Sequence, residues 1–126
     1  MRILIADDSL VIQGRLVKMV SQIHNAKVVG LANDGVEAIT SIQKLKPDLV
    51  ILDLRMPKVN GFDVIRNIKK NNLSTTVLVL TSFATIPHRE LCKQLGVKYF
   101  FDKTTEFEQA IEVIERLALL CDMHPV

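Results

Sequence analysis

Apolar residues are distributed along this chain in two alternating patterns. Short runs of branched apolar side chains predict buried strands, and longer stretches with apolar residues every three or four positions predict helices that bury one face. The predicted strands are residues 2–6, 27–32, 49–53, 76–80 and 97–101. Four predicted helices have their apolar positions within residues 12–23, 38–45, 64–68 and 107–117. A further helix is placed between Pro87, which suits a first turn, and Gly96, which suits a carboxyl-terminal cap.

Strand and helix alternate five times, which predicts an α/β fold with a parallel sheet covered by helices on both faces. Right-handed crossovers leave two strand orders open, that of a Rossmann half and the flavodoxin-like order 2-1-3-4-5. The turn after the first strand is Asp7-Asp8-Ser9, which lacks the glycine pattern of a dinucleotide site or a P-loop. This turn would repel phosphate without a cation. We therefore expect the flavodoxin-like order, with five strands and five helices.

Composition limits the classes of protein that this chain can represent. At 126 residues, 48% of them apolar, we expect a single domain over residues 1–126 with no output domain. No apolar run approaches the roughly 18 residues of a membrane span, and the amino terminus turns acidic too early for a secretory signal. We expect a cytoplasmic protein without membrane contact.

Sixteen basic and 14 acidic residues give a net charge of +2, too weak to indicate a nucleic-acid surface. Cys92 and Cys121 lack metal-ligand spacing and are expected to be reduced and mostly buried.

Polar residues follow several predicted strands at the point where each strand ends. Asp7 and Asp8 follow the first strand, Asp53 ends the third, Thr81 follows the fourth and Lys103 lies just after the fifth. In the order 2-1-3-4-5 the first and third strands are neighbours, so their carboxylates converge at one edge of the sheet. At about 5 Å and an effective dielectric near 20, each carboxylate pair repels by roughly 3 kcal/mol. Such a cluster favours Mg²⁺ or Mn²⁺.

A lysine and a hydroxyl beside a metal-binding carboxylate cluster indicate phosphoryl transfer. Asp53 would be the nucleophile that forms an aspartyl phosphate. The cation and Lys103 would balance the charge of the phosphoryl group, and Thr81 would donate a hydrogen bond to it. Each residue also has an ordinary structural explanation, as a solvated lysine, a β-branched strand residue or a helix cap. Their joint occurrence at four strand ends favours the functional explanation.

The chain resembles the receiver domains of two-component response regulators over essentially all of its length, and in particular the single-domain, chemotaxis-regulator-like members. The residues that carry the resemblance are Asp7, Asp8, Asp53, Met56, Pro57, Gly61, Thr81 and Lys103. It implies that Asp53 accepts a phosphoryl group from a histidine of a sensor kinase or phosphotransfer protein. It also implies that Mg²⁺ is bound by Asp8, Asp53 and the backbone carbonyl of Arg55, while Asp7 acts largely through water.

The resemblance further implies a switch and a partner surface. Thr81 and Phe100 would be the paired switch residues, and phosphorylation would change the face made by the fourth helix, fifth strand and fifth helix. An unknown downstream protein would bind this face, and a homodimer through it is a further expectation. Direct binding to nucleic acid is not expected. A receiver catalyses its own phosphorylation and dephosphorylation but turns over no independent substrate.

Several residues depart from the family pattern. Ser82 stands where relatives usually have Ala or Gly, and Phe100 lacks the hydroxyl of the usual Tyr. Thr104 replaces a proline that is often cis; because a cis bond without proline costs roughly 3 to 4 kcal/mol, we predict a trans bond or a strained exception. Arg55 and Phe83 flank the site, and together with Ser82 they are expected to modulate the dephosphorylation rate.

Two alternatives remain open from the sequence. One is an interaction module that keeps the fold but works without phosphorylation; the retained acidic residues, Thr81 and Lys103 count against it. The other is a Mg²⁺-dependent phosphohydrolase of the haloacid-dehalogenase type. Those enzymes need a second aspartate two residues after the nucleophile at the end of the first strand, and here the residue after Asp8 is Ser9.

Overall fold

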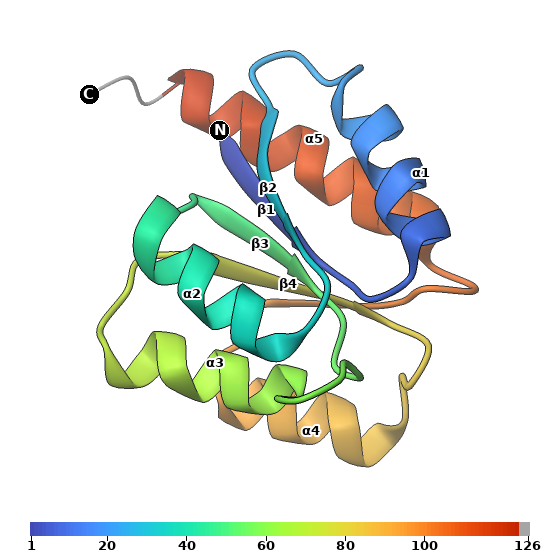
Figure 1. Ribbon diagram of the computed structural model, residues 1–126. Coiled ribbons are helices and arrows are strands. Elements are labelled where there is room, and N and C mark those ends of the chain that lie inside the picture. The colour runs from blue at the N-terminus through green and yellow to red at the C-terminus, as the bar shows by residue number, and fades with distance from the viewer. Residues whose placement is uncertain (124–126) are drawn as a thin grey trace.

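The structure, a computed structural model, describes residues 1–123 and has the predicted alternation of strands and helices (Figure 1). The strands are β1 (Arg2–Ala6), β2 (Lys27–Ala32), β3 (Leu49–Leu52), β4 (Thr76–Thr81) and β5 (Tyr99–Asp102). The helices are α1 (Leu10–Val20), α2 (Gly35–Leu45), α3 (Gly61–Lys70), α4 (Ile86–Gln94) and α5 (Phe107–Met123). All neighbouring strands are parallel, in the order β2-β1-β3-β4-β5. The flavodoxin-like order predicted from the sequence is confirmed.

Helices cover both faces of the sheet, with α1 and α5 on one side and α2, α3 and α4 on the other (Figure 1). Successive residues of a strand point to opposite faces. Ile3 and Ile5 accordingly join the core beneath α1 and α5, while Leu4 and Ala6 join the core on the opposite face. The central strand β3 is buried on both faces, as its unbroken apolar run predicts.

Local signals place most helix starts correctly. The side chains of Ser9, Asp34, Asn60 and Thr85 each accept a hydrogen bond from the backbone N–H three residues on, which caps α1, α2, α3 and α4. Among the described residues, no helix is both long and apolar enough to cross a membrane.

The end of α4 and the start of β5 differ from the expected boundary. Gly96 has the left-handed φ of +85° expected of a glycine that ends a helix. The backbone N–H of Val97 then donates to the carbonyl of Cys92 at 2.9 Å, so it closes the helix and is not available to the sheet. As a result β5 begins at Tyr99, two residues later than predicted, and extends to Asp102.

The cysteines meet the expectation only in part. Both are free, and Cys92 is buried, which raises the pKa of its thiol to about 11. Cys121 is exposed near the end of α5, so the prediction that both would be mostly buried is wrong for this residue. Its position explains the difference, because Ala118 is the last buried residue of α5 among the described side chains, and Leu119 and Leu120 are already exposed.

Candidate functional site

The register of the sheet brings the predicted acidic residues together. Ala6 and Leu52 are paired across β1 and β3. Asp7 and Asp53 are the next residues of the two chains, so they lie side by side. The N–H of Asp53 donates to the carbonyl of Ala6 at 2.9 Å, which holds the two strand ends side by side. The carboxyl ends of β1 and β3 therefore lie together at the same end of the sheet, on the right of the molecule in Figure 1.

Three carboxylates form a compact acidic group at this edge. One oxygen from each of Asp7, Asp8 and Asp53 lies within 4.8 Å of the other two. Asp7 and Asp53 are buried, whereas Asp8 is exposed to solvent. This spacing and this oxygen donor set fit a Mg²⁺ ion that keeps several of its water ligands. The metal-binding carboxylates that the resemblance implies are here assembled in one place.

Lys103 reaches the same cluster from the end of β5. Its Nζ lies 2.7 Å from Asp7 Oδ2 and 3.0 Å from Asp53 Oδ2, and its side chain is only 11% exposed. Burial by itself lowers the pKa of Lys103, but hydrogen bonds and charge attraction from the two carboxylates outweigh it and raise the pKa. The lysine therefore stays an ammonium group at neutral pH.

For Asp7, the effect of burial on the pKa is larger than the effect of its charged and hydrogen-bonding partners. Burial raises the pKa of Asp7 above its usual value, although Lys103 and the backbone N–H of Ser9 act to lower it. Three carboxylates against one ammonium also leave an excess of negative charge at this edge. Both effects would be relieved by a divalent cation, so the electrostatics of the site agree with its geometry.

A cavity of about 370 Å³ opens beside Asp53. It is lined by Asp8, Asp53, Arg55, Met56, Pro57, Ser82 and Phe83. The cavity is therefore shared by two of the acidic residues and by Arg55, Ser82 and Phe83, the three residues expected to modulate the dephosphorylation rate. Its walls are the loop that follows β3 and the loop that follows β4, so a group entering it would approach the Asp53 carboxylate from solvent.

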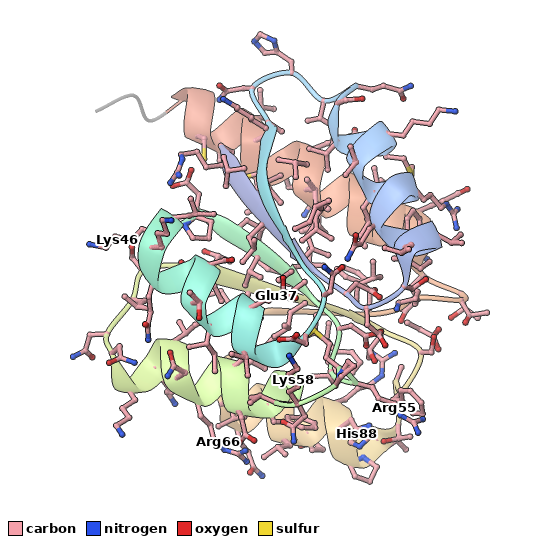
Figure 2. The ribbon with its side chains drawn as sticks, in the orientation of Figure 1. Glu37, Lys46, Arg55, Lys58, Arg66 and His88 are labelled. Atoms are coloured by element: carbon pink, nitrogen blue, oxygen red, sulfur yellow. The ribbon has the colours of Figure 1, made fainter. Side chains whose placement is uncertain are left out.

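The side chain of Arg55 connects those two loops in the lining of the cavity. Its backbone N–H donates to Asp53 Oδ1 at 3.3 Å, and its guanidinium lies 4.4 Å from the centre of the Phe83 ring. Figure 2 shows Arg55 near the start of α4, on the same side of the molecule as His88. Nδ1 of His88 lies 2.8 Å from the carbonyl oxygen of Phe83, which ties this loop to α4.

The two predicted switch residues lie on neighbouring strands. Thr81 is completely buried, and its hydroxyl oxygen accepts the backbone N–H of Phe83 at 3.2 Å. Phe100 is half-buried and packs against the core beneath α2, α3 and α4. The guanidinium of Arg89 lies 4.7 Å from the centre of the Phe100 ring. The Lys103–Thr104 bond is trans, as predicted.

Sequence reasoning did not identify Gln13, which contacts the acidic site, or the Arg89–Glu106 pair beside the predicted switch residue Phe100. Gln13 donates to the backbone of Asp7, and Arg89 contacts both Phe100 and Glu106. Gln13 had a detectable signal, because it is a polar residue at a position of α1 that helical spacing places on the buried face with Leu16. Arg89 and Glu106 had none, since their contact exists only once α4 packs beside β5.

Comparison with known proteins agrees with the fold and the site. The family model of the response regulator receiver domain matches residues 3–115, so this chain belongs to that family. It is 32% identical over 111 residues to a protein-glutamate methylesterase/protein-glutamine glutaminase of Treponema denticola, covering 86% of this chain and 30% of the relative. It is 36% identical over 112 residues to an uncharacterised transcriptional regulatory protein of Bacillus subtilis, covering 89% of this chain and 52% of the relative.

Solved structures give the same result. The response regulator domain of Thermotoga maritima CheB superposes with a TM-score of 0.84 at 28% identity, covering 99% of this chain and 98% of that one. The signal receiver domain of a NarL-type regulator from Mycobacterium tuberculosis has a TM-score of 0.85 at 26% identity, covering 93% and 94% of the two chains. The predicted family, fold and role as a receiver in two-component signalling are confirmed.

Proposed function

We propose that Asp53 is the phosphoacceptor of this receiver and that the described acidic group assembles its metal site. The observation that carries the proposal is the convergence of three carboxylates and the Lys103 ammonium beside an open cavity. Asp8, Asp53 and the backbone carbonyl of Arg55 would bind Mg²⁺ directly, and Asp7 through water. Mn²⁺ has the same preference for oxygen ligands and could replace it. The bound cation would supply positive charge for the phosphoryl oxygens.

The residues of the chain have separate roles in the transfer. A carboxylate oxygen of Asp53 forms the new bond to phosphorus, and the bond from phosphorus to the donor nitrogen breaks. Lys103 remains protonated. Its ammonium group, which now donates to Asp53 Oδ2, would instead donate to the phosphoryl oxygens. The donor that we propose is a phosphohistidine of a sensor kinase or phosphotransfer protein, since receiver domains interact with such proteins.

The signal would leave through the face made by α4, β5 and α5. We propose that the Thr81 hydroxyl, which now accepts from Phe83, turns toward the phosphoryl group and donates to it, and that Phe100 turns inward. A ligand shifts such an equilibrium only through different affinities for the two states, and a thousandfold shift needs roughly 4 kcal/mol. A few charge-assisted hydrogen bonds could supply it. An unidentified protein, or a second copy of the chain, would bind the changed face.

The proposal is tested by incubation with Mg²⁺ and acetyl phosphate or beryllofluoride, followed by intact mass and two-dimensional amide spectra. We expect a phosphoryl adduct that the Asp53→Asn variant does not form, with amide shifts that reach Thr81 and Phe100. The Thr81→Ala variant should form the adduct but lose the shifts at Phe100. Absence of both adduct and shifts at saturating Mg²⁺ would favour a module that works without phosphorylation. Rapid turnover of phosphatase substrates would favour the hydrolase alternative.

The chain spans about a third to half of the length of the curated relatives it matches, so their whole activities do not transfer to it. The absence of an output domain, the cytoplasmic location and the absence of direct nucleic-acid binding stay predictions. So does the homodimer through α4, β5 and α5. Mass measurement of the natural protein and light scattering of its phosphorylated form would test the first and the last of these.

A further inference from the structure

The turn that joins β2 to α2, defined here as residues 33–34 with Gly35, the first residue of α2, lies between the two loops that carry the proposed metal ligands. None of the three clustered carboxylates comes from this turn. On one side, the N–H of Asp7 donates to the carbonyl of Ala32, just before the turn, at 3.1 Å. On the other side, the N–H of Gly35 donates to the carbonyl of Pro57 at 3.2 Å. The end of β2 and the turn therefore contact the two loops, one on each side, without contributing a ligand.

The contact with the β3–α3 loop is close and charged. A Cβ atom added at Gly35 would lie 1.8 Å from the carbonyl oxygen of Val59, so only glycine allows this approach. Lys58 lies beside the amino-terminal end of α2 (Figure 2), where its ammonium is 3.4 Å from the carboxylate of Asp34. These contacts hold the β3–α3 loop, which contains Arg55, in a fixed position relative to the turn.

Gln13 joins the same turn to the acidic residues of the β1–α1 loop. It lies in α1 and is only 5% exposed. Its side-chain amide donates to the backbone carbonyl of Asp7 at 2.5 Å and to Oδ1 of Asn33 at 2.7 Å. Both amide hydrogens are therefore used, one toward the acidic loop and one toward the turn.

The bond from Gln13 acts on the peptide that links Asp7 to Asp8. The carbonyl that accepts this bond belongs to that peptide, and peptide groups are planar. Its orientation therefore sets the direction in which the chain enters Asp8. Unlike Asp7, whose carboxylate is held by Ser9 and Lys103, the carboxylate of Asp8 has no hydrogen bond or ion pair with the described residues. Its direction depends on its own backbone.

We infer that Gln13 is a positioning residue that aims the Asp8 carboxylate at the divalent cation, with residues 33–35 as its anchor. This inference rests on the metal site proposed above. Mg²⁺ requires near-ideal octahedral geometry, so a small rotation of the Asp7–Asp8 peptide weakens its binding. Partners that orient metal ligands typically contribute about 10- to 100-fold to metal affinity. Gln13 acts through a backbone carbonyl and on one of several ligands, so we expect the lower end of that range.

A purely structural role for Gln13 makes a different prediction. If the side chain only satisfies a buried carbonyl, its loss lowers the free energy of unfolding but leaves the metal affinity of the folded protein unchanged. The two quantities are therefore measured separately. Mg²⁺ affinity is obtained from amide shifts during titration of the folded chain, and stability from urea unfolding without metal.

The test compares Gln13→Met with Gln43→Met. Both replace an amide by an apolar side chain of similar length. Gln13→Met removes two amide hydrogen bonds, and Gln43→Met removes one, to Asn67 Oδ1 at 3.2 Å, which joins α2 to α3 away from the site. We expect the dissociation constant for Mg²⁺ to rise about tenfold in Gln13→Met and to stay unchanged in Gln43→Met. Asn33→Ala removes only the anchor and should give a smaller rise.

Each outcome decides between the proposals. Unchanged Mg²⁺ affinity in folded Gln13→Met would overturn this inference and leave the metal site intact. If Gln13→Met does not fold, the test rests on Asn33→Ala alone. Unchanged Mg²⁺ affinity in that variant would overturn the inference about Gln13. Should the wild-type chain bind no Mg²⁺, the proposed metal site fails, and this inference fails with it.

Discussion

Single residues at the site carry charges that the fold does not balance. Burial is the largest cause that raises the pKa of Asp7, and a raised pKa means that the folded state binds this proton more tightly than the unfolded chain does. The contribution of Asp7 to stability is therefore present at low pH and lost as pH rises through its folded pKa. An ionised Asp7 therefore costs folding stability.

A first prediction concerns Arg55, whose guanidinium covers the Phe83 ring in the lining of the cavity beside Asp53. In Arg55→Ala this cover is lost and water reaches the aspartyl phosphate more easily. We expect dephosphorylation to accelerate about two- to fivefold, because an exposed cation–π contact is worth about 0.5–1 kcal/mol. Intact mass recorded over time after removal of acetyl phosphate measures the rate.

Arg66→Ala provides the control, since Arg66 lies in α3 and pairs with Asp63 away from the cavity. Its dephosphorylation rate should equal that of the wild type. Slower dephosphorylation in Arg55→Ala would mean that the guanidinium assists the attacking water and does not shield the phosphoryl group.

At the scale of elements, two glycines in helices have opposite surroundings. Gly14 lies inside α1, and a Cβ atom there would meet nothing within 4 Å. Gly61 begins α3, and a Cβ atom there would lie 2.6 Å from Leu54 Cα and 2.7 Å from the carbonyl oxygen of Asp53. The first glycine only weakens its helix, whereas the second allows α3 to start directly against the end of β3, beside the proposed phosphoacceptor Asp53.

Alanine substitution should therefore change stability in opposite directions at these two positions. We expect Gly14→Ala to stabilise the protein by about 0.5–1 kcal/mol, because alanine loses less backbone entropy on folding. Gly61→Ala should destabilise it by about 1–3 kcal/mol through overpacking against backbone atoms. Urea unfolding measures both, and a stabilising Gly61→Ala would show that α3 can move away from the strand end without cost.

A second prediction at this scale concerns the contact between α4 and the start of α5. Glu106 accepts the backbone N–H of Asp102 and pairs with Arg89 of α4 at 2.9 Å. The Asp102 hydrogen bond first, and Arg89 second, lower the pKa of Glu106 below its usual 4.5. A lowered pKa in the folded state gives stability that is present above pH 4.5 and lost as pH falls through the folded pKa.

The Glu106→Gln variant should therefore be less stable than the wild type at neutral pH, and the difference should shrink as pH falls below 4.5. We expect about 1 kcal/mol or less, because the pair is partly exposed and screened by solvent. Thermal unfolding between pH 3 and pH 7 measures the difference, with Glu90→Gln in exposed α4 surface as the control. A difference that is independent of pH would assign the effect to packing.

At the scale of the whole molecule, the parallel sheet gathers loops that are far apart in the sequence. The acidic group joins the ends of β1 and β3, and Lys103 is contributed from β5 at the edge of the sheet. A ligand bound there contacts segments separated by most of the chain. It should therefore stabilise the fold as a unit and not one element alone.

We accordingly predict that Mg²⁺ raises the midpoint of thermal unfolding. At a concentration ten times the dissociation constant, binding to the folded state adds about 1.4 kcal/mol, which corresponds to a few degrees. Chelation should remove the effect, and Asp8→Asn should abolish most of it. An equal increase in Asp8→Asn would show that the ion acts elsewhere on the chain.

Much of this fold and site could be predicted from the sequence because the signals are local. The apolar run at 49–52 predicts a buried strand, and the alternation of such runs with helical spacing predicts a parallel sheet. The carboxyl ends of parallel strands meet at one edge, so polar residues at those ends are brought together by topology alone. For this reason Asp7, Asp53 and Lys103 could be placed before any contact was known.

The remaining features depend on contacts between distant segments, which leave no local pattern. The bond of Gln13 to the turn at residue 33, and that of Arg89 to Glu106, form only after helices have packed on the sheet. The late start of β5 follows from the hydrogen bond that Val97 donates to the end of α4. The sequence by itself thus determined the elements, their order and the residues at the strand ends, because periodicity and topology are encoded locally. The tertiary structure alone decided how those residues are oriented, because orientation depends on side chains that meet from remote parts of the chain.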